Sequence, residues 1–296
     1  MRYEAAHATS TGDRAVNQDR CALAESAGSV LMCLADGMGG HPKGEAAAQI
    51  LIDTGRRMFR EAPKPVADPP AFLAHLMHAA HEAIVAYGKS QGPGIEPRST
   101  AVIALIQKGA ACWLHAGDSR LYLFRHGRIL TRTLDHSYVE LLRQQGAISR
   151  DECIHHPYRN YVTRCLGGKM PPMDLTPGGP IPLQPGDILL LCSDGLWGPM
   201  DDAALTKNMQ AGQPLSDIIE RMVGQAQAAA SPGSDNITAM ALRWIQGAPA
   251  GPARGKGGKP AAAAAGGPED EDARLAQAVE HLRNTIQSFK IEQENP

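Results

Sequence analysis

Four short apolar runs of the 296-residue chain each have an aspartate within two residues of one end. The runs are VLMCLA, ACWLHA, ILLLC and ITAMAL, and the acids are Asp36, Asp118, Asp194 and Asp235. A single aspartate at such a place is usually a turn former, because Asp and Gly dominate turns. If the runs are strands of one sheet system, however, the four carboxylates can converge at a common edge.

Carboxylates that converge repel one another, and removing them from water costs free energy unless a cation offsets their charge. Oxygen ligands without a cysteine or histidine pattern suit hard cations such as Mg²⁺, Mn²⁺ or Ca²⁺. Glycines follow Asp36 and Asp194 directly. They would let backbone carbonyls approach the same ion. The pattern predicts a metal centre built from several carboxylates.

Arg14 lies three residues before the tripeptide Asn17-Gln18-Asp19, which precedes a predicted strand over 20–24. An arginine beside a metal centre can bind a phosphate group through two parallel N–H donors. Taken alone, an arginine at such a position is more often a surface residue. Arg14 is therefore a candidate phosphate ligand only in combination with the metal centre.

Short strands and amphipathic helices must position these residues. The apolar runs do not alternate polar and apolar residues, so the strands should be covered on both faces. Helices with one apolar face supply that cover. The predicted strands are 20–24, 30–35, 100–106, 111–116, 121–124, 188–192 and 237–242, and the predicted helices are 44–59, 70–87, 138–145 and 215–229.

Only the tetrapeptide GDSR separates the predicted strands 111–116 and 121–124. So short a connection favours an antiparallel hairpin over a βαβ unit. Strands joined by hairpins, together with long separate helices, indicate an α+β domain of layered architecture.

The overall composition excludes several other classes of protein. With 29 Lys and Arg against 31 Asp and Glu, the chain lacks the basic excess of a nucleic-acid-binding protein. Its six cysteines form no C-x-x-C pair, which argues against zinc and redox motifs and favours reduced cysteines. No secretory signal is evident, and the apolar runs are far shorter than the ~20 residues of a membrane span. We expect a cytoplasmic protein without a membrane span or a nucleic-acid partner.

A break in composition divides the chain after residue 246. Residues 247–270 are dominated by Gly, Ala and Pro, which predicts a flexible linker after the folded domain 1–246. In 271–296, apolar residues follow a 4-3-4-3 spacing that predicts an amphipathic helix. This helix could recruit a partner or fold back on the main domain. Its apolar stripe comprises Leu275, Val279, Leu282, Ile286 and Phe289.

Taken in order, the motifs of residues 3–245 resemble the type 2C (PPM) protein phosphatases in their bacterial form. The DG pairs are common one by one, so the specificity lies in the whole ordered set. The set is Arg14-x-x-Asn17-Gln18-Asp19, Asp36-Gly37-Met38-Gly39-Gly40-His41, Gly117-Asp118-Ser119-Arg120, Asp135-His136-Ser137, Ser193-Asp194-Gly195-Leu196-Trp197 and Asp235-Asn236-Ile237-Thr238.

The resemblance implies an αββα sandwich, in which two packed antiparallel sheets are flanked by helices. It implies that Asp36 bridges two Mn²⁺ or Mg²⁺ ions and that three further groups complete the ligands. A third, weaker ion would involve Asp118. Asp19 would orient water from the outer shell, and Arg14 would bind the phosphate. The three completing ligands are the Gly37 carbonyl, Asp194 and Asp235.

The resemblance also implies a reaction, in which a metal-bridging hydroxide hydrolyses phosphoserine or phosphothreonine in proteins. Two cations lower the pKa of a shared water and offset phosphoryl charge. The expected partners are phosphorylated proteins, namely a bacterial Ser/Thr kinase and its substrates. A catalytically silent binding module and a different carboxylate–metal enzyme, such as a phosphodiesterase, remain as alternatives.

The chain departs from the family pattern at two positions. Met38 stands where eukaryotic members often have a histidine that is proposed to protonate the leaving group, so metal-bound water is one alternative source of that proton. Gln18 replaces a common glutamate and removes one acid from the outer shell. Residues 141–168 resemble the bacterial flap beside the active site. Within the flap, His156 and Arg159 are candidate substrate contacts, with a solvated surface loop as the alternative.

Overall fold

Two five-stranded sheets form the centre of the computed structural model, which describes residues 1–39, 43–168, 175–209 and 212–246. The first sheet has the strand order β1-β12-β11-β7-β8 and the second β10-β6-β5-β3-β2, with all neighbours antiparallel. Their bounds are β1 Arg2–Ser10, β2 Asp19–Ser26, β3 Ser29–Asp36, β5 Ala101–Gln107, β6 Ala110–Ala116, β7 Arg120–Arg125, β8 Arg128–Arg132, β10 Gly178–Pro182, β11 Ile188–Cys192 and β12 Ile237–Gln246.

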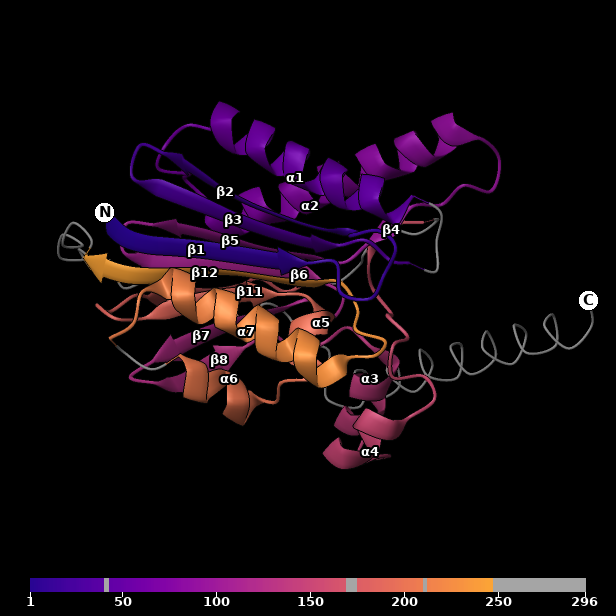
Figure 1. Ribbon diagram of the computed structural model, residues 1–296. Coiled ribbons are helices and arrows are strands. Elements are labelled where there is room, and N and C mark those ends of the chain that lie inside the picture. The colour runs from indigo at the N-terminus through magenta and orange to yellow at the C-terminus, as the bar shows by residue number, and fades with distance from the viewer. Residues whose placement is uncertain (40–42, 169–174, 210–211, 247–296) are drawn as a thin grey trace, which may run out of the picture. The chain divides into compact units, whose positions relative to one another are not determined.

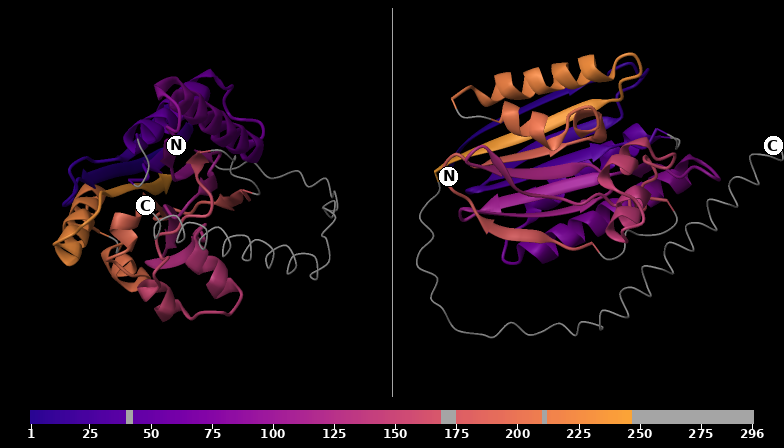
Figure 2. Two further views of the ribbon diagram at one scale, coloured as in Figure 1. Left: turned by 90° about the vertical axis from the view of Figure 1, so that its right-hand side faces the viewer. Right: turned by 90° about the horizontal axis from the view of Figure 1, so that it is seen from below.

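Helices cover the outer faces of both sheets (Figure 1). Helices α1 and α2 pack on the second sheet, and α5, α6 and α7 pack on the first. The four layers are also seen in the other views (Figure 2), and they confirm the predicted αββα sandwich. The helices are α1 Gly44–Glu61, α2 Pro69–Gln91, α3 Tyr138–Gln144, α4 Arg150–His155, α5 Asp194–Trp197, α6 Asp202–Asn208 and α7 Leu215–Ala230.

Three apolar clusters explain why the strands do not alternate in polarity. In β3, Leu31 and Cys33 pack toward α1 and α2, whereas Met32 and Leu34 pack between the sheets. Successive side chains of a strand point to opposite faces, so a strand inside four layers needs apolar residues at every position. Each buried leucine contributes about 1.5–3 kcal/mol of transfer free energy.

The predicted hairpin over 111–116 and 121–124 is wrong. Strand β6 pairs with β5 and β10 in one sheet, and β7 pairs with β11 and β8 in the other. The residues between Ala116 and Arg120 therefore carry the chain from sheet to sheet. Stacked sheets lie about 10 Å apart, a span that three extended residues can cross. The length of the connection alone could not distinguish these two arrangements.

The sequence prediction also missed several elements. Strands β1, β8 and β10 contain few large apolar residues and are only partly buried. The short strands β4 (Arg98–Ser99) and β9 (Leu166–Gly167) pair with each other, and Ser99 also forms an isolated bridge with Gly37. Gly146 has a φ of 69° just past α3, as predicted for a helix cap. The linker 247–270, the helix 271–296 and His41 lie outside the described residues. None of the described helices is long and apolar enough to cross a bilayer.

Candidate metal centre

One end of the second sheet carries three of the predicted site residues. Asp36 is the last residue of β3 and the register partner of Asp19 at the start of β2. At the same end, β6 finishes at Ala116, opposite Ala101 of β5. Asp118 follows two residues later, in the connection to the other sheet. The register of the sheet therefore brings these three aspartates to one edge.

The corresponding end of the first sheet supplies the other two aspartates. Strand β11 finishes at Cys192, which pairs with Ala239 near the start of β12. Asp194 follows β11 as the first residue of α5, and Asp235 lies just before β12. Since the connection from β6 to β7 joins this end to the matching end of the second sheet, aspartates from both sheets meet at the junction.

Neutral hydroxyl groups hold the strand ends together. The Ser193 hydroxyl donates to Asp19 Oδ2 at 2.7 Å and accepts the Thr238 N–H at 3.0 Å. This connects three strands from both sheets. The Thr100 and Ser119 hydroxyls share a hydrogen bond of 2.7 Å beside Asp118. Sequence reasoning missed these hydroxyl contacts, because Ser and Thr near strand ends look like ordinary turn residues.

Burial, and after it the charges of neighbouring carboxylates, raises the pKa of four of these aspartates. Desolvation raises the pKa of Asp19 to about 6 and that of Asp118 to about 7, with nearby carboxylate charges adding to the effect. Burial, followed by repulsion from the other aspartates, also raises the pKa of Asp36 and Asp194. Asp19 and Asp118 expose only 3% and 6% of their surface, whereas Asp36, Asp194 and Asp235 are half-buried.

The donor set fits divalent cations by its chemistry. All five side chains offer oxygen, and Asp19 Oδ1 is buried without a hydrogen-bond partner. A nearby cation would relieve both the repulsion and the unmet hydrogen-bonding capacity. Among the described residues, no three Asp, Glu, His or Cys side chains are gathered closely enough to ligate one ion as they stand. The ligand set therefore stays a prediction, and it requires rotation of some carboxylates.

Asp235 is one of the carboxylates that would have to turn, because Arg14 holds it in its present orientation. The Arg14 guanidinium donates to Asp235 Oδ2 at 2.8 Å, and the other oxygen of Asp235 accepts the Asn236 N–H at 2.8 Å. Both oxygens of Asp235 are thus engaged. Arg14 lies beside the candidate metal centre, where the sequence analysis expected it, and its side chain is 57% exposed.

Close backbone contacts explain two of the glycines. A Cβ atom on Gly37 would lie 2.4 Å from the Gly44 backbone, and one on Gly195 would lie 2.1 Å from the Asn236 carbonyl oxygen. Neither contact is tolerable, so both positions require glycine for packing. This requirement is independent of any approach of the glycine carbonyls to an ion.

Trp197, Arg120 and Asp135 form a series of contacts that ends at the Asp118 backbone. Trp197 Nε1 donates to the Asp118 carbonyl oxygen at 2.9 Å, and the Arg120 guanidinium lies 3.5 Å from the Trp197 ring centroid. Arg120 also forms a bidentate ion pair with Asp135, with both N–O distances 2.7 Å. The family-like motifs containing these residues are therefore joined in space by direct contacts.

The hydrogen bonds of the two predicted flap residues lie within the flap, and the His156 ring also lies 6.0 Å from the ring of Tyr138 at the start of α3. His156 Nδ1 accepts the Tyr158 N–H at 3.1 Å, and Arg159 donates to the Ile154 carbonyl at 3.2 Å. Arg159 is exposed and His156 is half-buried. These contacts do not bring either residue to the aspartates, and their role toward a substrate remains a prediction.

The packed antiparallel sheets, the outer helices and the aspartates gathered at one end of both sheets together define the protein phosphatase 2C class. The family model described as Protein phosphatase 2C matches residues 8–240. The chain belongs to this family.

Two curated relatives and one solved structure illustrate the similarity. Serine/threonine protein phosphatase PstP of Mycobacterium tuberculosis (strain CDC 1551 / Oshkosh) is 34% identical over 213 residues, which are 72% of this chain and 40% of PstP. The match thus spans less than half of that relative. Protein phosphatase PhpP of Streptococcus pneumoniae serotype 2 is 32% identical over 214 residues, covering 72% of this chain and 85% of PhpP. The PstP catalytic domain in complex with two manganese ions has a TM-score of 0.69 and 30% identity, covering 82% of this chain and 99% of that chain.

Proposed function

We propose that this chain is a metal-dependent phosphatase that hydrolyses phosphoserine and phosphothreonine monoesters in proteins. The observation that carries the proposal is that five aspartates from both sheets lie near enough to raise the pKa of Asp36 and Asp194, with Arg14 paired to one of them, Asp235. The family membership and the manganese complex of the PstP catalytic domain support it. Because PstP and PhpP are bacterial phosphatases, we expect its partners to be a bacterial Ser/Thr kinase and the substrates of that kinase, in the cytoplasm.

Each site residue has a proposed task. Asp36 would hold both of two Mn²⁺ or Mg²⁺ ions, with the Gly37 carbonyl, Asp194 and Asp235 as further ligands. Asp118 would contribute to a third, weaker site. When bound, two such ions supply a water of lowered pKa and offset the charge of the phosphoryl group.

Asp19 and Arg14 would act on the water and the substrate. The unpartnered Oδ1 of Asp19 can accept a hydrogen bond from a water and so orient it. Arg14 is exposed and has five N–H donors, so it can bind a phosphate while one donor stays with Asp235. A guanidinium at this place stabilises charge that develops on the phosphoryl oxygens. Met38 has no proton to donate, so the leaving oxygen must receive its proton from another group.

The test is hydrolysis of a phosphothreonine peptide with and without Mn²⁺, with Asp194→Asn as the matched control. We expect Mn²⁺-dependent release of phosphate by the wild type. The variant should lose about a hundredfold or more of the rate, because it removes a ligand charge while conserving shape. Equal rates for the two proteins would contradict the proposal and favour a silent binding module. Preference for a bis-ester over the monoester would favour a phosphodiesterase.

A further inference from the structure

Asp13 connects two loops that lie far apart in the sequence. Its Oδ2 accepts the backbone N–H groups of Gly233 at 2.7 Å and Ser234 at 3.0 Å. The same oxygen accepts the hydroxyls of Ser234 at 3.1 Å and Ser231 at 3.4 Å. We call Asp13, Ser231, Gly233 and Ser234 the Asp13 clamp.

The backbone strengthens the clamp from the opposite direction. The Asp13 N–H donates to the Ser234 carbonyl at 3.1 Å and lies 3.1 Å from the Ser234 hydroxyl oxygen. On the neighbouring residue, a Cβ atom added to Gly12 would lie 2.2 Å from the Asp235 carbonyl oxygen. The two loops are therefore in direct backbone contact, and Asp13 is their shared acceptor.

The residues next to the clamp belong to the candidate site. Arg14, the proposed phosphate ligand, directly follows Asp13. Asp235, a proposed metal ligand, directly follows Ser234. The two are themselves joined by the ion pair of 2.8 Å. The positions of both side chains thus depend on the backbone that the clamp fixes.

A general structural role for Asp13 explains these contacts less well. Its side chain is exposed, and the N–H groups of Gly233 and Ser234 lower its pKa, so it is ionised at neutral pH. An aspartate that merely forms a turn bonds its own local backbone. Here the carboxylate accepts hydrogen bonds from Ser231, Gly233 and Ser234, in the loop that carries Asp235.

We propose that Asp13 is a positioning residue that holds Arg14 and Asp235 in register, and so sets both phosphate binding and metal affinity. This inference rests on the proposed function. Without the clamp, the loops of Arg14 and Asp235 can separate, and each site residue must be ordered again when its ligand binds. Loss of the clamp should therefore weaken the binding of Mn²⁺ and of the phosphopeptide, and should change kcat much less once both are bound.

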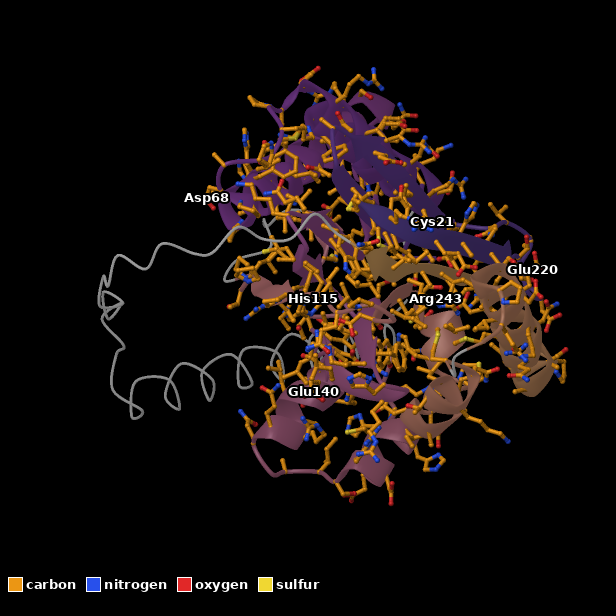
Figure 3. The ribbon with its side chains drawn as sticks, turned by 90° about the vertical axis from the view of Figure 1, so that its left-hand side faces the viewer. Cys21, Asp68, His115, Glu140, Glu220 and Arg243 are labelled. Atoms are coloured by element: carbon orange, nitrogen blue, oxygen red, sulfur yellow. The ribbon has the colours of Figure 1, made fainter. Side chains whose placement is uncertain are left out.

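The experiment compares Asp13→Ala, Asp13→Asn and the control Asp68→Ala in the full chain. Asp68, labelled in Figure 3, is also an exposed acid that accepts a backbone N–H, from Ala71 at 3.0 Å, but it caps α2. Calorimetric titration with Mn²⁺ gives the metal affinity of each protein. Hydrolysis of a phosphothreonine peptide at saturating Mn²⁺ gives KM and kcat separately.

We expect Asp13→Ala to raise the Mn²⁺ dissociation constant and the peptide KM by about tenfold each, the effect of losing roughly one charge-assisted hydrogen bond. The kcat should change by less than about threefold. Asp13→Asn keeps an acceptor oxygen and should recover most of both affinities. Asp68→Ala should leave both affinities unchanged.

Matching affinities for Asp13→Ala and Asp68→Ala would overturn the inference, as would a loss confined to kcat. If Asp13→Ala does not fold, Ser234→Ala carries the same comparison, because it removes the hydroxyl of the clamp from the other loop. Unchanged Mn²⁺ affinity and peptide KM in Ser234→Ala would likewise overturn the inference. A wild-type chain that neither binds Mn²⁺ nor hydrolyses the peptide would instead contradict the proposed function itself.

Discussion

At the scale of single residues, Asp19 and Asp36 at the junction are held by neutral groups. Asp19 is bound by the Ser193 hydroxyl, and the Asp36 carbonyl accepts the Ser99 hydroxyl at 2.9 Å and the Thr100 N–H at 2.8 Å. These contacts fix the backbone without neutralising the carboxylates. Above the raised pKa values of these acids, the site therefore carries negative charge that a divalent cation can offset.

The raised carboxylate pKa values predict how stability depends on pH. Asp19 and Asp118 have pKa values of about 6 and about 7, above their ordinary value of 3.8, so the folded protein binds protons that the unfolded chain releases. The contribution of these two acids to the stability of the metal-free protein should therefore be fully present below the unfolded pKa and be lost as pH rises from about 4 to about 7. Mn²⁺ should raise the unfolding temperature more at about pH 8 than at about pH 5, because its ligands must be deprotonated.

Differential scanning fluorimetry with Mn²⁺ and with a chelator measures this dependence. Asp36→Asn is the control, because it removes one acid from the cluster and should reduce the Mn²⁺ effect at every pH. Stabilisation by Mn²⁺ that is as large at acidic pH as at alkaline pH would contradict the account.

Trp197→Phe should weaken the support of Asp118. The change removes the indole N–H that binds the Asp118 carbonyl but keeps an aromatic ring near Arg120. We expect a loss of about 1 kcal/mol in unfolding free energy from that hydrogen bond. We also expect weaker binding of the last Mn²⁺ ion in a titration. Trp244→Phe, in the core between the sheets, serves as control and should leave Mn²⁺ binding unchanged.

At the scale of elements, the sequence predicted the buried strands well, because their apolar runs are long and bounded by turn residues. It placed β3, β5, β11 and the start of β12 nearly correctly. It could not place β6 and β7 in different sheets, since a short connection fits either arrangement. The partly buried β1 and β8 carry too few large apolar residues to be recognised.

The same limit applies to the candidate site. The aspartates could be found because each follows or precedes an apolar run. The roles of Ser193, Thr238 and Asp13 could not, since their contacts join residues more than 40 positions apart, as in the Ser193–Thr238 bond with a separation of 45. Such contacts depend on sheet register, which periodicity alone does not give.

The ion pair between Arg120 and Asp135 connects the start of β7 to the segment before α3. Its side chains are only 13% and 10% exposed. Asp135→Asn should destabilise the protein by about 3 kcal/mol, because it leaves the Arg120 charge poorly compensated. Urea unfolding measures the loss. The exposed pair Arg57–Glu61, tested by Glu61→Gln, should contribute less than about 0.5 kcal/mol. Equal losses of unfolding free energy in the two variants would show that the buried pair Arg120–Asp135 stabilises the protein no more than the exposed pair does.

At the scale of the whole molecule, the candidate site exists only where both sheets end together. Asp19 and Asp36 lie in strands of the second sheet, and Asp118 lies in the connection that leaves it. Asp194 and Asp235 lie next to strand ends of the first sheet. All five lie within residues 1–246. Removal of residues 247–296 should therefore leave the unfolding temperature, Mn²⁺ affinity and peptide hydrolysis unchanged.

Comparing the truncated and full-length chains in these three measurements tests the proposed domain boundary. A truncated chain that fails to fold would show that the C-terminal segment belongs to the catalytic domain. Changed localisation in cells with unchanged hydrolysis would instead support a partner for the predicted helix 271–296.

The most direct test of the central claim is a crystal structure of the protein with Mn²⁺, with anomalous scattering used to locate the ions. We predict two peaks, each within bonding distance of a carboxylate oxygen of Asp36, with Asp194 and Asp235 turned toward at least one of them. Mn²⁺ peaks elsewhere with none beside Asp36, at concentrations that support hydrolysis, would contradict the account.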